Sequence, residues 1–228
     1  MHIHLPKPAH GWRELFGEVG IIVLGVLIAL GFEQLVESIH ERTIAAEAGE
    51  AIRAEVRENL WWLERREEME PCIQTAFSDL EALNLRARHG DVVPVVHGLN
   101  LPIHAKITAL RWDSNSQAGR TSLFSGEEQR MFGNMYYSTE EFLRSQEQEE
   151  AIWAKMGFVR GIDRLTPADI HDLGMLLAEA RYHDKRAKLD IERGHQWAAK
   201  LHLVAANPNS VEKMRSIAAS ACPAMVEL

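Results

Sequence analysis

The sequence predicts an all-α protein, in which one N-terminal transmembrane helix continues into a periplasmic bundle of three or four long helices. Three observations lead to this fold class. Val19–Phe32 is a run of fourteen residues without a polar side chain. After it, apolar residues recur at three- and four-residue steps as far as Pro71, which is the period of an amphipathic helix. Helix start signals then stand at Ser125 and Thr166.

Residues 12–36 read WRELFGEVGIIVLGVLIALGFEQLV and form the predicted transmembrane helix. A helix needs roughly 20 apolar residues to cross a bilayer, and Leu15 and Val36 extend the central run toward that length. Trp12 stands at the start of this segment, where tryptophan is enriched because its ring suits the lipid–water boundary. We therefore expect Trp12 to anchor the helix at the membrane interface.

Two other interpretations of this segment are open. A cleaved signal peptide would have a basic start, here Lys7 and Arg13, and a cleavage site at Ala29-Leu30-Gly31. The helical pattern, however, runs on past Gly31 without a turn residue. A core helix of a soluble protein is the second alternative, and it leaves Trp12 without a physical reason. An uncleaved membrane helix is the favoured interpretation.

Glu18, Gly25 and Ala29 fall on one face of this helix at 100° per residue. Small residues let two helix backbones approach closely in lipid, so Gly25-x-x-x-Ala29 predicts a contact with a partner helix. A carboxylate in the hydrocarbon region is costly and usually faces a protein interior. Glu18 either lies at headgroup depth or is sheltered by that partner.

The charges that flank the helix predict its orientation. Lys7 and Arg13 precede it, and the first basic residue after it is Arg42. By the positive-inside rule, residues 1–11 form a cytoplasmic tail, 12–36 the transmembrane helix and 37–228 a periplasmic helical domain. The expected location is a bacterial inner membrane, in contact with its lipid.

Periodicity and punctuation residues predict the remaining elements. The first helix is expected to continue to residue 70, with Gly49 as the place for a bend. Gly90, the prolines at 94 and 102 and Gly98 predict an irregular insertion near 90–104. The other expected helices are 72–89, 105–118, 126–160, one that begins after Thr166 and runs to 206, and a last short one at 210–221.

The chain has two cysteines, Cys72 and Cys222, and both adjoin a proline. In an oxidising compartment such as the periplasm, two cysteines favour a single disulfide. The bridge would join the start of the second helix to the last residues of the chain. Two independent buried thiols are the alternative.

Composition argues against several functional classes. A net charge of −8 does not suit a nucleic-acid surface, which needs clustered lysine and arginine. The sequence shows no nucleophile motif, phosphate loop or zinc-ligand set, so we expect no catalysis, cofactor or metal. Glu37-x-x-His40 and Glu192-x-x-His195 match the spacing of di-metal helical proteins, but the pattern arises often by chance in a glutamate-rich chain.

The block GWRELFGEVGIIVLGVLIALGFEQLVE resembles the N-terminal signature of uncharacterised single-span membrane proteins of alphaproteobacteria, especially sphingomonads. The segment RWDSNSQAGRTSLFSGEEQRMFGNMYY is similar in layout to their central tryptophan-containing segment. The resemblance implies a single-span membrane protein and no particular activity.

The expected function is that of a membrane-anchored interaction or accessory subunit, either a homo-oligomer or part of a larger membrane complex. The alternative is a periplasmic helical bundle that senses a ligand through a partner. Such a sensor would need a pocket between helices, near Asp184 or Gln146, because both residues interrupt apolar stripes.

Overall fold

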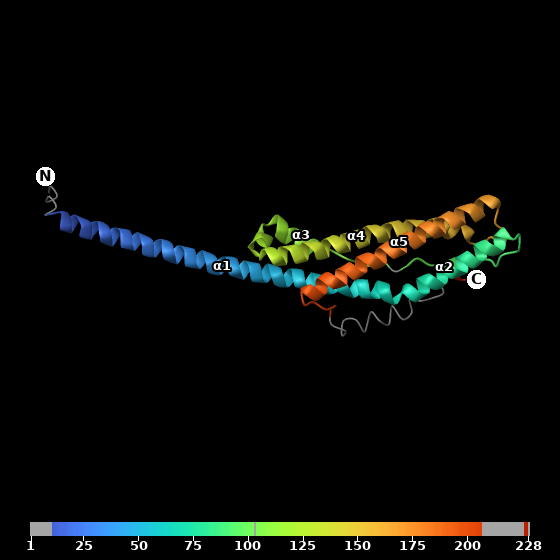
Figure 1. Cartoon of the computed structure of the whole chain (residues 1–228), viewed down its shortest axis with the longest axis horizontal. Helices are drawn as coiled ribbons and strands as arrows, with labels where there is room; N and C mark the ends of the chain where they lie inside the picture. The colour runs from blue at the N-terminus through green and yellow to red at the C-terminus, as the bar shows by residue number, and fades with distance from the viewer. Residues whose placement is uncertain (1–10, 103, 207–225, 228) are drawn as a thin grey trace, which may run out of the picture. The chain divides into compact units, whose positions relative to one another are not determined.

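The computed structural model describes residues 11–102, 104–206 and 226–227, and these are mostly helical with almost no strand. Contacts divide the chain into an N-terminal unit, Met1–Glu47, and a C-terminal unit, Ala48–Leu228. The elements, coloured along the chain in Figure 1, are α1 (Trp12–Glu68), α2 (Glu70–Arg88), β1 (Gly98–Leu99), α3 (Leu110–Gln117), the 3-10 turn η1 (Arg120–Leu123), α4 (Gly126–Met156), the 3-10 turn η2 (Gly157–Val159), α5 (Pro167–Lys200) and β2 (Val226–Glu227).

The N-terminal unit contains the apolar half of α1. Its stretch from Leu15 onward is long and apolar enough to cross a membrane, and the most apolar window has no buried residue. Large side chains such as Ile21 and Phe32 are 74% and 65% exposed. Among the described residues this run therefore forms no part of a core, which argues against the core-helix interpretation. The expectation of a long apolar N-terminal helix is confirmed.

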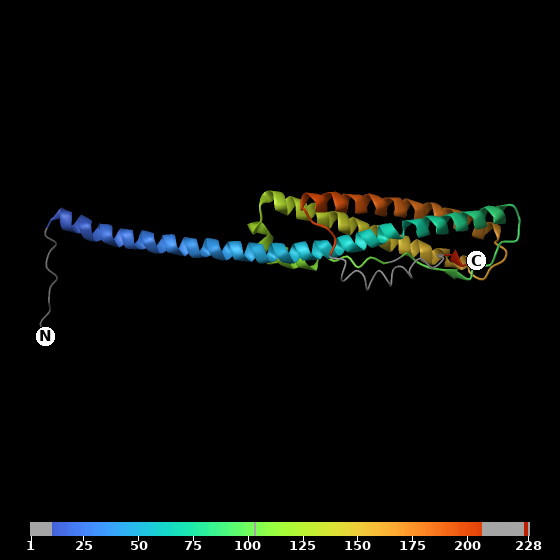
Figure 2. The same ribbon diagram turned by 90° about the horizontal axis from the view of Figure 1, so that it is seen from below.

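In the C-terminal unit α4 runs along α5, and α2 packs on α5 (Figures 1 and 2). The apolar stripes predicted for these helices meet here: Phe77 of α2 stacks on Trp153 of α4 with ring centroids 5.3 Å apart. Leu173 and Leu177 of α5 are buried in the same core. Burying aromatic and leucine side chains contributes about 1.5–3 kcal/mol for each, so this stripe-to-stripe packing is the main stabilising term of the unit.

Both predicted helix starts are confirmed. At Ser125 the hydroxyl accepts from the amide of Glu128, and the Glu128 carboxylate accepts from the amide of Ser125, both at 3.2 Å. Thr166 and Asp169 form the same reciprocal pair at the start of α5, and Pro167 occupies the first helical position. Each reciprocal pair is a capping box, which satisfies amide groups that have no partner inside the helix.

Several expected boundaries were wrong. Residues 105–109 are not helical, and α3 begins only at Leu110, because the backbone of this segment is bonded to side chains of other helices. The helix expected at 126–160 ends at Met156 and tightens into η2. The last long helix ends at Lys200 and not at 206: His202 adopts a left-handed conformation (φ 54°), and the amide of Ala206 donates to the carbonyl of Arg57.

Two further expectations concern Gly49 and the chain end. Helix α1 continues through Gly49 without a break. A Cβ there would lie 2.7 Å from the Arg53 guanidinium, so this glycine makes room for a side chain. The helix expected at 210–221 lies outside the described residues.

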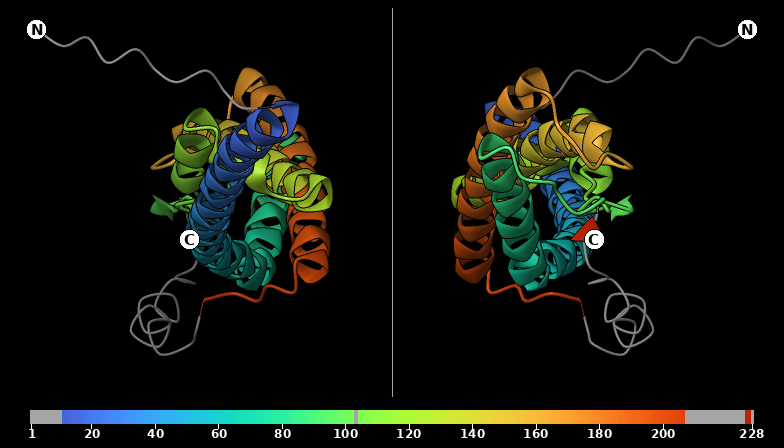
Figure 3. Two further views of the ribbon diagram at one scale, coloured as in Figure 1. Left: turned by 90° about the vertical axis from the view of Figure 1, so that its left-hand side faces the viewer. Right: turned by 90° about the vertical axis from the view of Figure 1, so that its right-hand side faces the viewer.

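The irregular insertion after α2 is extended. Gly98 and Leu99 pair in antiparallel register with Glu227 and Val226, and Val96 forms a parallel bridge with Arg160. Val226 is buried in the core that α2, α4 and α5 share. In the end-on views of Figure 3, the extended insertion lies beside these helices. The insertion is thus fixed to the helical core by residues distant in sequence.

Candidate functional site

The residues predicted to pack in the membrane lie together on an open surface of α1. Trp12 is 76% exposed, and Glu18, Gly25 and Ala29 are also exposed. A Cβ built on Gly25 would meet no atom within 4 Å. Within the described part of the chain nothing therefore covers this face. Helix packing at Glu18, Gly25 and Ala29, and interface anchoring by Trp12, stay predictions about contacts with other molecules.

The predicted disulfide involves one described residue. Cys72 lies in the first turn of α2, half-buried against the hydrophobic core. Cys222 lies outside the described residues. The pairing of Cys72 with Cys222 therefore stays a prediction.

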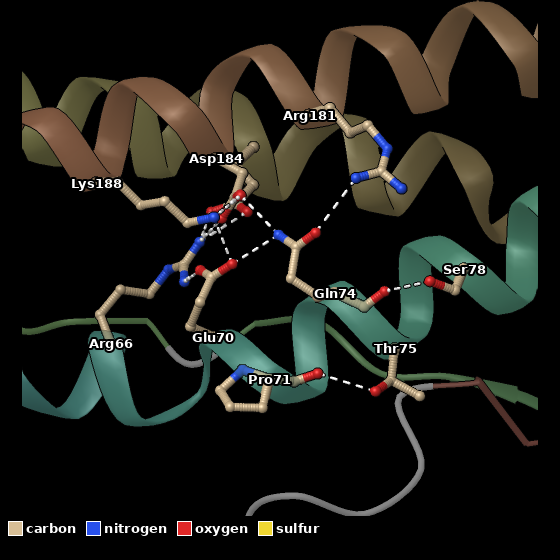
Figure 4. Close-up of polar contacts among 10 residues, drawn as sticks. Arg66, Glu70, Pro71, Gln74, Thr75, Ser78, Arg181, Asp184 and Lys188 are labelled. Atoms are coloured by element: carbon tan, nitrogen blue, oxygen red, sulfur yellow. Dashed lines mark hydrogen bonds and ion pairs between the residues drawn. The ribbon is translucent and has the colours of Figure 1, made fainter.

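A buried network of charged side chains joins all the long helices of the C-terminal unit (Figure 4). Arg66 of α1 is 1% exposed and stands at its centre. One guanidinium nitrogen donates to both carboxylate oxygens of Glu149 of α4, at 3.0 and 3.2 Å, and to Asp184 of α5 at 2.8 Å. Its other terminal nitrogen lies 3.4 Å from Glu70 of α2. Since the four residues come from four helices, the network fixes these helices relative to one another.

Lys188 of α5 completes the inner part of the network. Its ammonium group lies 2.5 Å from Glu70 and 2.9 Å from Asp184. The side-chain amide of Gln74 donates to the same two carboxylates, at 2.6 and 3.0 Å. The pairing of Asp184 with Lys188 one turn away is a common way to satisfy a buried acid. Asp184 is thus saturated by partners from its own protein.

Arg181 links this network to the surface. It donates to the carbonyl oxygen of the Gln74 side chain at 3.2 Å and to Glu81 at 2.6 Å. Its guanidinium also lies over the ring of Phe77, 4.8 Å from the centroid. Figure 4 shows the resulting chain of contacts from Lys188 through Gln74 to Arg181. Charge and hydrogen bonding therefore continue along the seam between α2 and α5.

The network holds three carboxylates, Glu70, Glu149 and Asp184, against two cations, Arg66 and Lys188, so one negative charge is in excess. Burial raises the pKa of Glu149, and the neighbouring Asp184 adds to this, against the opposing attraction of Arg66. Burial also acts to raise the pKa of Asp184, but hydrogen bonds from Lys188 and Arg66 outweigh it and the pKa is lowered. Of Glu149 and Asp184, Glu149 therefore takes up a proton more readily.

For the two cations of the network, burial and the neighbouring carboxylates shift the pKa in opposite directions. Burial alone would lower the pKa of Arg66, yet Glu149 and Asp184 outweigh it and the pKa is raised. The pKa of Lys188 is raised in the same way, because Glu70 and Asp184 outweigh its burial. Both cations stay charged, so a proton enters or leaves this network at a carboxylate.

Another buried carboxylate, outside the Arg66 network, organises the start of α3. Glu55 of α1 is 5% exposed, and Ala109, the residue before α3, supplies no capping side chain. The Glu55 carboxylate accepts from the amides of Arg111 and Trp112, at 2.9 to 3.3 Å. It thus satisfies the unpaired amides at the start of α3 from a distant helix and places a negative charge at the positive end of the helix dipole.

The same carboxylate holds two side chains. The hydroxyl of Thr108 donates to it at 2.9 Å, and that of Tyr136 of α4 donates at 2.7 Å. Burial, followed by the hydrogen bond to Glu55, raises the pKa of the Tyr136 phenol far above its usual range. The phenol therefore remains a hydrogen-bond donor at every physiological pH.

Two amide side chains hold the non-helical segment before α3. Asn59 donates to the carbonyl of Thr108 at 2.7 Å and accepts from its amide at 3.1 Å. Gln146 accepts from the amide of Ala105 at 2.8 Å. These bonds replace the internal bonds of a helix, which is why residues 105–109 are not helical. Gln146 therefore serves the backbone and does not face an open pocket.

The two residues of the Glu192-x-x-His195 spacing have other partners in the structure. His195 lies 3.3 Å from Glu67 of α1, and Glu192 accepts a hydrogen bond from Gln196. In the ranges that the structure describes, no group of three histidine, cysteine, aspartate or glutamate side chains is placed to hold a metal ion.

Sequence reasoning singled out Asp184 and Gln146 but missed Glu55, Asn59 and Arg66 in α1. A signal was present, because these three stand at three- and seven-residue distances from the buried Ile52 and Leu63. Polar residues on an apolar stripe indicate buried polar contacts. Their partners in α3, α4 and α5 follow only from the tertiary structure.

No protein-family model, curated protein or solved structure matches this chain. Its function is therefore inferred from the chemistry of its own residues.

Proposed function

We propose that the chain is a membrane-anchored subunit that acts by protein–protein association, with its helical domain in the periplasm of a bacterial inner membrane. The observation that carries the proposal is the exposed apolar surface of α1 between Leu15 and Val36. Exposed patches of this size mark contacts with lipid or protein. Within that surface, Gly25 and Ala29 offer a place where a partner helix could approach closely.

The chemistry of the C-terminal unit supports association over catalysis. Its buried charged groups are bonded to one another, as Arg66 is to Glu149 and Asp184. A catalytic group must be within reach of a substrate, and these groups are enclosed by their own partners. A network of this kind stabilises one arrangement of helices, which suits a rigid binding module.

The test is purification of the full chain in a mild, non-ionic detergent, followed by native mass spectrometry. We expect a mass above that of one chain, from a second copy or from a co-eluting membrane protein. A monomer without a co-eluting protein, at a concentration at which the helical unit is folded by circular dichroism, would contradict the proposal.

A further inference from the structure

A pocket of about 430 Å³ opens between α3, the segment before it and α4. This volume lies in the range of small-molecule sites. Glu55 accepts hydrogen bonds from the start of α3 and from Tyr136 of α4, and Asn59 holds the segment before α3. The lining residues are Ile107, Thr108, Ala109, Trp112, Asp113, Gly133, Tyr136, Tyr137, Thr139, Glu140 and Leu143.

Aromatic rings form one side of this pocket. Trp112 stacks on Tyr136 with ring centroids 5.3 Å apart and an angle of 18° between the planes. The Tyr136 hydroxyl donates to the buried Glu55, so its hydrogen bond is already made within the protein. Tyr137, next along α4, is 57% exposed. Tyr136 is itself only 5% exposed, so the rings of Trp112 and Tyr137 supply most of the aromatic surface of the pocket.

The electrostatics of the pocket are negative. Asp113 and Glu140 line it, and the lining contains no lysine, arginine or histidine. Glu140 also pairs with Arg144 at 2.9 Å, but both side chains are exposed, where solvent weakens such a pair. Glu55, behind Tyr136, has no cationic side chain as a partner in the described ranges, although hydrogen-bond donors surround it.

Aromatic faces and carboxylates have one class of ligand in common. The face of a ring carries negative charge and attracts cations, most strongly those that lose little hydration. A phenol that donates to a carboxylate has a more electron-rich ring, so Glu55 strengthens this attraction at Tyr136. A neutral apolar ligand would leave the charges of Asp113 and Glu140 unused, and a metal ion would gain nothing from the rings.

We propose that this pocket binds a small, free quaternary ammonium compound, with its trimethylammonium group against the rings of Trp112 and Tyr137, where Tyr136 stacks on Trp112. Asp113 and Glu140 then balance the positive charge. A lipid headgroup carries the same ammonium group beside a phosphate, which the two carboxylates repel, so the free cation is the favoured source. This site is separate from the association proposed above and does not depend on it.

Calorimetric titration of the full chain with choline tests the proposal, in a maltoside detergent that carries no choline group. We expect saturable binding of choline, at least about tenfold tighter than that of its neutral carbon isostere, in which carbon replaces the ammonium nitrogen. Phosphocholine should bind more weakly than choline, because its phosphate meets the same carboxylates.

Two variants locate the site, and each has a matched control. Tyr137→Leu and Asp113→Asn should each weaken choline binding by about 3- to 30-fold. Both residues are exposed, so the helical unit should fold normally in each variant. Tyr182→Leu removes a tyrosine of similar exposure from α5, and Asp91→Asn removes an exposed charge in the segment after α2; neither residue lines the pocket, so neither change should affect binding.

Three results would overturn the proposal. The first is no binding of choline to the folded chain, and the second is equal affinity for choline and its neutral isostere. The third is equal loss of affinity in the pocket variants and their controls. Phosphocholine binding as tight as that of choline would contradict the assignment to a free cation.

Discussion

At the scale of single residues, Glu149 is a buried carboxyl group of the network whose pKa is raised by burial. Its pKa is raised in the folded protein, so the fold favours its protonated form. The stability that this contributes is complete below the ordinary glutamate pKa and is lost as pH rises through the raised value. Asp184 has a lowered pKa, so its contribution is lost instead as pH falls.

Glu149→Gln should therefore gain stability relative to the wild type as pH rises from the ordinary glutamate pKa to the raised pKa of Glu149. The difference should grow by up to about 1.4 kcal/mol per pH unit, the value for one proton. Denaturant unfolding at a series of pH values measures it. Glu147→Gln, which changes an exposed glutamate of the same helix, should keep the wild-type profile. Parallel profiles for all three proteins would show that Glu149 does not titrate in this range.

Arg66 has the largest predicted effect on stability. Its removal leaves Glu149 and Asp184 buried with one cation fewer, and loss of one partner from a buried ion pair typically costs about 3–5 kcal/mol. Arg66→Met should therefore destabilise the C-terminal unit by that amount in equilibrium unfolding. Arg130→Met, at an exposed site on α4, should stay within about 0.5 kcal/mol of the wild type. Similar values for both variants would contradict the central role of Arg66.

At the scale of elements, helix α3 depends on a carboxylate from another helix. Glu55→Gln leaves one acceptor oxygen where a carboxylate had two, and turns an amide group toward donors. We expect a loss of about 2–4 kcal/mol, from two or three hydrogen bonds that are left unmade. The near-ultraviolet circular dichroism of Trp112 should change with it, since Glu55 holds the Trp112 amide.

The exposed neighbour provides the control for that change. Glu58 is an exposed glutamate three residues after Glu55 on the same helix, so Glu58→Gln should leave stability unchanged. If Glu55→Gln were as harmless as Glu58→Gln, the cap on α3 would not be a source of stability.

Local sequence signals predicted the helices well where contacts between residues close in sequence determine the structure. The boxes at Ser125 and Thr166 need only residues three apart, and both helix starts were correct. Residues 105–109 were expected to be helical and are not, because Asn59 and Gln146 bond to their backbone from distant helices. Sequence periodicity gives no information about side chains from distant helices that compete for the backbone hydrogen bonds of a helix. For the same reason Asp184 was noticed, but its main partner Arg66 was not.

At the scale of the whole molecule, the orientation of α1 can be tested directly. Lys7 and Arg13 before the apolar segment predict a cytoplasmic N-terminus. Alkaline phosphatase fused after Leu228 should then be active in a bacterial host, because the enzyme needs the periplasm to form its disulfides. An inactive fusion, with an active cytoplasmic reporter at the same position, would reverse the orientation.

The central claim is that the chain associates through the Gly25 and Ala29 face of its apolar helix. The most direct measurement is the mass of the purified complex in mild detergent for a double variant, Gly25→Leu with Ala29→Leu. Leucine at both sites holds two backbones apart, so the complex should dissociate. Gly20→Leu with Gly31→Leu adds the same bulk on the other side of the helix at 100° per residue, and this control should keep the wild-type mass. An intact complex in the first variant, or equal dissociation in both, would contradict the claim.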